Sequence, residues 1–136
     1  MRVVLDTNVL VSALLTPHGP PARIVRFALA GDIALLHDER ILAEYREVLT
    51  RARFGFDPHD VAVVLEELER LGEPVLARPL YVTLPDPDDL PFLEVAVAGD
   101  TEALVTGNFK HFEPATRSHA LAIVTPAELL ERLRHA

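Results

Sequence analysis

The side chains best suited to chemistry in this chain are oxygen donors placed next to apolar segments. Asp6 directly follows the apolar run RVVL, and Asn108 follows ALVTG. Asp89 ends the loop PDPDD, and Glu44 lies inside the segment ILAEYREVL. Several carboxylates suit a hard divalent cation, and the chain has no Cys that could supply a thiolate. The pattern therefore favours a Mg²⁺ or Mn²⁺ site, because such ions activate water and neutralise charge on a phosphate.

Each acid also has a structural interpretation. Asp6 could cap a helix, although Thr7 and Asn8 follow it and are themselves cap-forming residues. Glu44 falls at the edge of the apolar stripe of its helix, where a carboxylate needs an arginine, solvent or a metal as partner. Acids also gather before helices because the helix dipole favours them there, which applies to Asp89. The remaining acids of that loop are interpreted as turn residues or as supports of the site: Asp86 and Asp88.

The elements that must position these residues alternate between strands and helices. Strand-like apolar runs cover 2–6, 33–37, 103–106 and 121–125, with a short extended stretch over 79–84. Helical patterns cover 9–15, 22–30, 39–52, 59–71, 91–98 and 126–136. Strands that are continuously apolar and alternate with helices indicate a parallel sheet covered on both faces. In such open sheets ligands bind beyond the carboxyl ends of the strands, so the polar residues there can converge.

Composition is consistent with one domain over residues 1–136. The chain is 49% hydrophobic, which argues against disorder. Its net charge of −8 argues against a general nucleic-acid coat protein but allows a local basic rim. The N-terminus lacks the apolar core of a signal peptide, and no apolar run is long enough to span a membrane. We therefore expect a cytoplasmic protein without membrane association.

Other catalytic motifs are missing from the sequence. The six histidines include no HExxH motif and no tight pair, and we interpret His111 and His119 as surface residues. Glycine-rich nucleotide-binding motifs do not occur. Ser12 and Ser118 lack the sequence of a nucleophile elbow.

The order of the segments resembles the PIN-domain family. The resemblance rests on VVLDTNVLVSALL, then ILAEYREVL, then LPDPDDLPFLEVAVAGDTEALVTGNFKHF, and it extends over essentially the whole chain. The chain is similar in particular to small prokaryotic, VapC-like members that act as toxins of toxin–antitoxin pairs. The segments above supply four or five strands, and the resemblance implies a Rossmann-like α/β/α sandwich with a central parallel sheet. It also implies metal-dependent ribonuclease activity, a small antitoxin partner and a homodimer.

The resemblance assigns roles to individual residues. Asp6, Glu44 and Asp89 match the first three acids of the family, the last because it stands seven residues before an alanine. The fourth acidic position falls on Asn108, where the family commonly has Asp. The polar residues that usually line the site correspond to Asn8 and Thr106.

These matches lead to a hypothesis for the reaction. Asp6, Glu44 and Asp89 would hold Mg²⁺ or Mn²⁺, and a metal-bound water would attack an RNA phosphodiester. Asn108 would orient the water or contact the metal through its neutral oxygen. The RNA backbone would lie on a rim of basic residues: Arg46, Arg51, Arg53, Lys110 and Arg117.

Two other functions remain compatible with the sequence. One is a PIN-like module with weak or no catalysis that binds RNA or protein, which Asn108 and the acidic composition favour. The other is a phosphatase with Asp6 as nucleophile. The phosphatase is less favoured because such enzymes use a DxD motif, whereas the residue two positions after Asp6 is Asn8.

Overall fold

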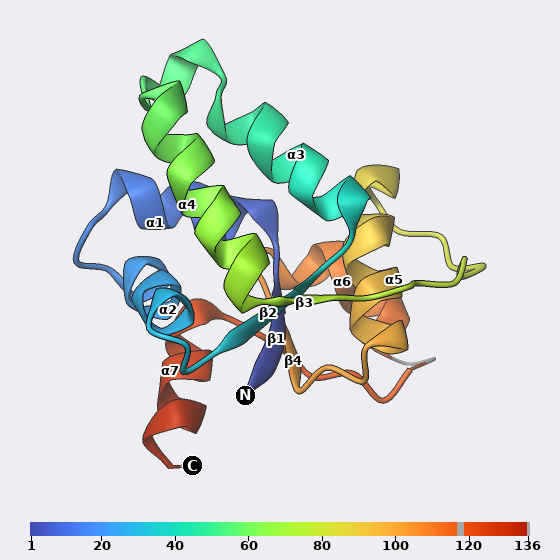
Figure 1. The fold of residues 1–136 in the computed structure, drawn as a ribbon. Coiled ribbons are helices and arrows are strands. Elements are labelled where there is room, and N and C mark those ends of the chain that lie inside the picture. The colour runs from blue at the N-terminus through green and yellow to red at the C-terminus, as the bar shows by residue number, and fades with distance from the viewer. Residues whose placement is uncertain (117–118, 136) are drawn as a thin grey trace.

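The centre of the structure is a five-stranded sheet in which all strands run parallel, in the order β3-β2-β1-β4-β5 (Figure 1). The computed structural model describes residues 1–116 and 119–135. The strands are β1 (Arg2–Leu5), β2 (Ala34–His37), β3 (Glu73–Pro74), β4 (Ala103–Val105) and β5 (Ile123–Val124). This arrangement confirms the expected α/β fold with a central parallel sheet.

The middle strands are apolar throughout because both faces of the sheet are covered. Val3, Val4 and Leu5 of β1 have no exposed surface, and the same holds for Leu104 and Val105 of β4. Consecutive strand residues point to opposite faces, so complete burial of neighbours requires helices on both sides.

The helices form these two covering layers (Figure 1). They are α1 (Thr7–Leu15), α2 (Pro20–Leu29), α3 (Glu39–Leu49), α4 (Pro58–Leu71), α5 (Leu90–Ala98), α6 (Phe109–Thr116) and α7 (Pro126–Arg134). One face carries α1, α2, α4 and α7, the other carries α5 and α6, and α3 packs beside α1 and α4. The described residues also include two 3₁₀ turns, η1 (Ala52–Phe54) and η2 (Pro87–Asp89). Among the helices that the structure describes, none has the length and hydropathy required to cross a lipid bilayer.

The edge of the sheet differs from the prediction. The extended stretch expected over 79–84 does not join the sheet, and the edge strand is β3, which pairs with β2 through Leu36 and His37. Residues 75–86 contain neither helix nor strand, and Tyr81 is fully exposed. A strand of two residues has no hydrophobic periodicity, and Pro74 is tolerated there because edge strands need fewer backbone donors.

Helix α6 is absent from the prediction. Its sequence, FKHFEPAT, is short and contains Pro114, which normally argues against a helix. Phe112 and Ala115 are both fully buried and stand three residues apart, so they form one apolar face. Packing of that face therefore stabilises the helix in spite of its weak local propensity.

Candidate active site

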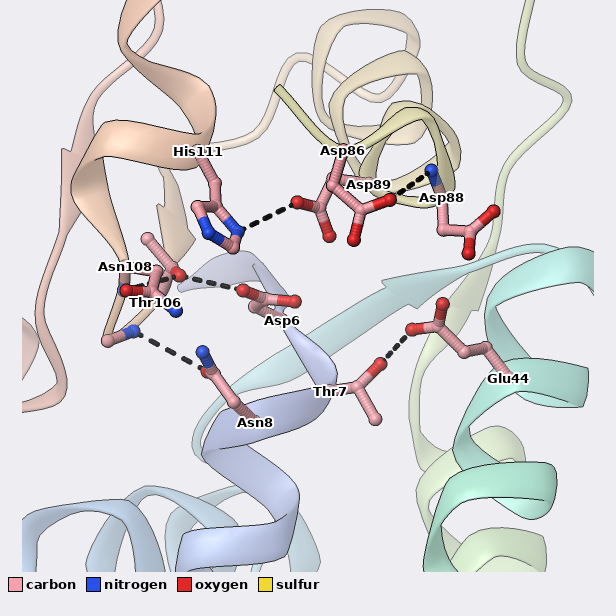
Figure 2. Close-up of polar contacts among 11 residues, drawn as sticks. Asp6, Thr7, Asn8, Glu44, Asp86, Asp88, Asp89, Thr106, Asn108 and His111 are labelled. Carbon is pink, nitrogen blue, oxygen red and sulfur yellow. Dashed lines mark hydrogen bonds and ion pairs between the residues drawn. The ribbon is translucent and has the colours of Figure 1, made fainter. Parts of the chain in front are cut away.

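Asp6 lies in the middle of the candidate site, at the carboxyl end of β1 (Figure 2). Its backbone N–H donates to the carbonyl of Val105 in β4 at 2.9 Å, and only 5% of the residue is exposed. Thr106 follows β4 and donates its hydroxyl to Asp6 Oδ2 at 2.7 Å. The sheet extends from β1 in one direction through β2 and in the other through β4, so the strand order reverses here. Ligands of open parallel sheets bind at such a reversal.

Glu44 reaches the site from α3. Its Oε2 accepts a hydrogen bond from the hydroxyl of Thr7, the first residue of α1. The neighbouring Tyr45 is buried and donates its hydroxyl to the carbonyl of Leu5 at 2.5 Å, which fixes α3 against the end of β1. The partner of Glu44 is therefore a threonine rather than an arginine. The expectation that Thr7 and Asn8 cap α1 is wrong, because both lie inside the helix.

The loop before α5 brings a third acid to the site. Asp86 accepts the backbone N–H of Asp88 at 3.0 Å, which caps the turn η2 and agrees with its interpretation as a turn residue. Asp89 at the end of the turn is 8% exposed, and its Oδ2 lies 3.0 Å from Nδ1 of His111 in α6. The interpretation of His111 as an ordinary surface residue is therefore wrong.

Burial raises the pKa of Asp6 and of Glu44 above their usual values. For Asp6, hydrogen bonds from Thr106 and from the backbone of Thr7 lower the pKa, while the charge of Asp86 raises it. For Glu44, the hydrogen bond from Thr7 lowers the pKa, while the charges of Asp6 and Asp86 raise it. Both carboxylates are thus held in an environment that disfavours their charged form.

Among the three acids, Asp89 has the largest rise in pKa. Burial raises the pKa of Asp89 from 3.8 to about 6, and the charges of Asp6 and Asp86 add to the rise. His111 acts in the opposite direction through its charge and its hydrogen bond. Acids that raise one another's pKa values in this way favour the binding of a cation, because its charge offsets their repulsion.

The turn after β4 supplies further polar groups beside Asp6. The backbone N–H of Asn108 donates to Oγ1 of Thr106 at 2.9 Å, and Gly107 N lies 3.5 Å from Oδ1 of Asn8. Asn108 is exposed, whereas Asn8 is partly buried. Figure 2 shows Thr106 and Asn108 on one side of Asp6, and Glu44, which comes from α3, on the other. All the residues proposed from the sequence as ligands or lining therefore surround the carboxyl ends of β1 and β4.

The residues of the predicted basic rim differ in how freely their charges are available. Four of its members are exposed: Arg46, Arg51, Arg53 and Lys110. Arg51 pairs with Glu47 at 2.8 Å, so its charge is partly neutralised, and the guanidinium of Arg53 lies 4.7 Å from the ring centroid of Phe54. Arg117 lies outside the described residues.

The chemistry of these donors fits a hard divalent cation. Carboxylates dominate the group, with hydroxyl and amide oxygens beside them, and the chain has no Cys. Within residues 1–116 and 119–135, no group of three or more His, Cys, Asp or Glu side chains is already arranged to hold a metal ion. The donor types therefore fit the ion, but the side chains would have to come closer together to bind it.

Fold and site together define a class of protein. It is a parallel α/β domain with mutually repelling carboxylates at the point where its strand order reverses. A sequence profile of the PIN domain matches residues 2–110, and the chain belongs to the PIN-domain family. The matched segment includes Asp6, Glu44, Asp89 and Asn108. Family membership supports a nuclease as the general class of activity.

The fold has a solved counterpart. A chain in the crystal structure of VapBC2 from Rickettsia felis, bound to a DNA fragment from its promoter, superposes with a TM-score of 0.60 and 17% sequence identity. The match covers 92% of this chain and 98% of that chain. At this identity the likeness establishes the fold alone. No curated protein matches the sequence.

Proposed function

We propose that this protein is a metal-dependent endoribonuclease that hydrolyses RNA phosphodiester bonds, and that it is the toxin of a toxin–antitoxin pair. The observation that carries the proposal is the position of Asp6, Glu44 and Asp89 around the end of β1, each with a raised pKa. Membership of the PIN-domain family supports the nuclease class. Buried and half-buried acids that destabilise one another's charges are explained by a bound cation rather than by folding.

Asp6, Glu44 and Asp89 are the proposed metal ligands, and Asn108 adds a neutral oxygen. When Mg²⁺ or Mn²⁺ is bound at such a site, it supplies an activated water and neutralises charge on the phosphate. The protein contributes the orientation of its carboxylates. The hydroxyl of Thr106 holds one oxygen of Asp6, as the donor–acceptor distance of 2.7 Å indicates.

The proposed RNA-binding rim comprises the basic residues named from the sequence. Arg46 and Arg53 lie towards the end of α3 and in η1, and Lys110 lies in the first turn of α6. Such side chains bind the RNA backbone through phosphate contacts that weaken with salt. Arg51 contributes less because it already pairs with Glu47. Arg117 belongs to the same proposal from its sequence position.

The proposal is tested by RNA cleavage with added Mg²⁺ or Mn²⁺. Wild-type protein should cleave RNA, and a chelator should abolish cleavage. Asp6→Asn and Asp89→Asn should both be inactive while remaining folded. Asp32→Asn is the matched control, because this exposed aspartate lies just before β2, at the opposite end of the sheet. Activity that survives the chelator would refute the metal, and activity that survives both site substitutions would refute the site.

A second candidate function is a PIN-like module with weak or no catalysis that binds RNA or protein. The neutral Asn108 and the separation of the acids within the described residues favour it. This function predicts RNA retention in a binding assay that Asp6→Asn leaves unchanged, without any metal-dependent product.

The proposed partners are a small antitoxin protein and a second copy of the chain, in the cytoplasm. The neighbour in the solved structure is a VapBC2 assembly, which supports a partner of this type. Exposed apolar side chains such as Leu76 and Tyr81, which are 95% and 100% exposed, are consistent with a protein interface. Light scattering of the purified chain tests the dimer, and co-purification from its native host tests the antitoxin.

A further inference from the structure

Each of the three candidate ligands has one carboxylate oxygen held by a donor from another element. Thr106, after β4, donates to Oδ2 of Asp6, and Thr7 at the start of α1 donates to Oε2 of Glu44. The third acid, Asp89, has the same kind of arrangement, with a histidine in place of the threonine.

The contact between Asp89 and His111 is well defined. His111 Nδ1 lies 3.0 Å from Oδ2 of Asp89, although the two residues are 22 positions apart in the chain. An ionised carboxylate has only acceptors, so the ring nitrogen carries the proton and donates it. Figure 2 shows the ring of His111 directed at Asp89 from α6.

The backbone that carries His111 is tied to the same turn that supports Asp6. The N–H of His111 donates to the carbonyl of Asn108 at 3.0 Å, and the N–H of Asn108 donates to the hydroxyl of Thr106 at 2.9 Å. Thr106 in turn donates to Asp6. The turn between β4 and α6 therefore presents a donor to Asp6 at one end and a donor to Asp89 at the other.

Fold stability does not account for this ion pair. The side chain of His111 is 39% exposed, and partly exposed charged pairs contribute little to stability. Asp89, in contrast, is nearly buried and stands between η2 and α5. The hydrogen bond from His111 therefore holds one oxygen of a nearly buried carboxylate in a fixed direction.

We propose that His111 is a positioning residue, which orients Asp89 for the divalent cation through the hydrogen bond from Nδ1. This inference rests on the proposed metal-dependent function. Partners that orient a metal ligand in this way affect metal affinity by about 10–100-fold.

The test measures Mn²⁺ affinity of the protein by electron paramagnetic resonance or calorimetry, without RNA. His111→Ala should weaken Mn²⁺ binding by about 10–100-fold. His111→Asn places an amide N–H₂ near the position of Nδ1, whereas His111→Gln places it near Nε2. Asparagine should therefore restore most of the affinity and glutamine should not. His59→Ala, at an exposed position in α4, is the matched control and should bind Mn²⁺ like the wild type.

Each outcome decides the proposal. Equal affinity of wild type and His111→Ala would overturn the role of His111 and leave the metal site in place. Failure of the wild type to bind Mn²⁺ would overturn the proposed function together with this inference. If His111→Ala does not fold by circular dichroism, the comparison of Asn with Gln still decides, and a better rescue by Gln would overturn the assignment to Nδ1.

Discussion

Replacement of Asp89 by asparagine is expected to stabilise the metal-free protein at neutral pH. Burial and the charges of Asp6 and Asp86 raise the pKa of Asp89 from 3.8 to about 6. For an acid whose folded pKa is raised, the contribution to stability is complete below the unfolded pKa and is lost as pH rises through the folded pKa. Asparagine is neutral in both states and avoids this loss. Its amide oxygen can also still accept the hydrogen bond from His111.

The size of the gain follows from the shift. One pKa unit corresponds to about 1.4 kcal/mol, so a rise from 3.8 to about 6 corresponds to about 3 kcal/mol in the absence of screening. His111 beside Asp89 is partly exposed, as is Asp86, so water screens these charges that act on Asp89. We therefore expect a gain of about 1–2 kcal/mol in the free energy of unfolding.

Urea denaturation in the presence of a chelator measures this gain. The free energy of unfolding of Asp89→Asn should exceed that of the wild type at about pH 8. The difference should shrink to a small fraction at about pH 4, where the folded wild-type carboxyl is protonated and the unfolded one is about half protonated. Added Mn²⁺ should stabilise the wild type, because it binds only the folded state. It should not stabilise the variant, which lacks one of the proposed ligand carboxylates. Asp32→Asn is the control and should show neither effect. A variant that is less stable than the wild type at both pH values would refute the electrostatic reasoning.

Two further substitutions test other parts of the site. Asn108→Asp adds a carboxylate beside Asp6, so it should tighten Mn²⁺ binding and lower metal-free stability at neutral pH; unchanged values of both would make Asn108 a turn residue only. Tyr45→Phe removes the donor to the buried carbonyl of Leu5, so it should lower the free energy of unfolding by about 1–2 kcal/mol, and an unchanged urea midpoint would contradict the proposed anchoring of α3.

The parts of the site that the sequence predicts are those that depend on strand ends. An acid directly after a continuous apolar run is visible in RVVLD, and the parallel sheet then places Asp6 beside the end of the strand ALV. Glu44 is recognisable because it sits at the edge of an apolar stripe, and its hydrogen bond to Thr7 satisfies the need for a partner. These inferences need only the fold class and the periodicity of single elements.

The roles of Thr7 and His111 could not be predicted in the same way. Thr7 was expected to cap a helix, but α1 begins one residue after Asp6, which turns the hydroxyl of Thr7 towards α3. His111 lies in a helix whose sequence contains Pro114, so its local pattern gave no reason to expect a fixed orientation. The spacing of Phe112 and Ala115 was the available signal, because it marks the buried face of that helix.

The structure of the turn LVTGN explains why an asparagine is tolerated at position 108, the fourth acidic position of the family. Its contributions to the site in the structure come from the hydroxyl of Thr106 and from backbone groups of Asn108, which support Asp6 and the start of α6. A backbone donor and a backbone acceptor need no negative side chain, so this framework does not require a carboxylate at position 108. What changes is the charge of the site, since three acids attract a cation less strongly than four. In the proposed site, Asn108 would therefore affect how tightly a cation binds, whereas Thr106 and His111 would affect how the carboxylates are oriented.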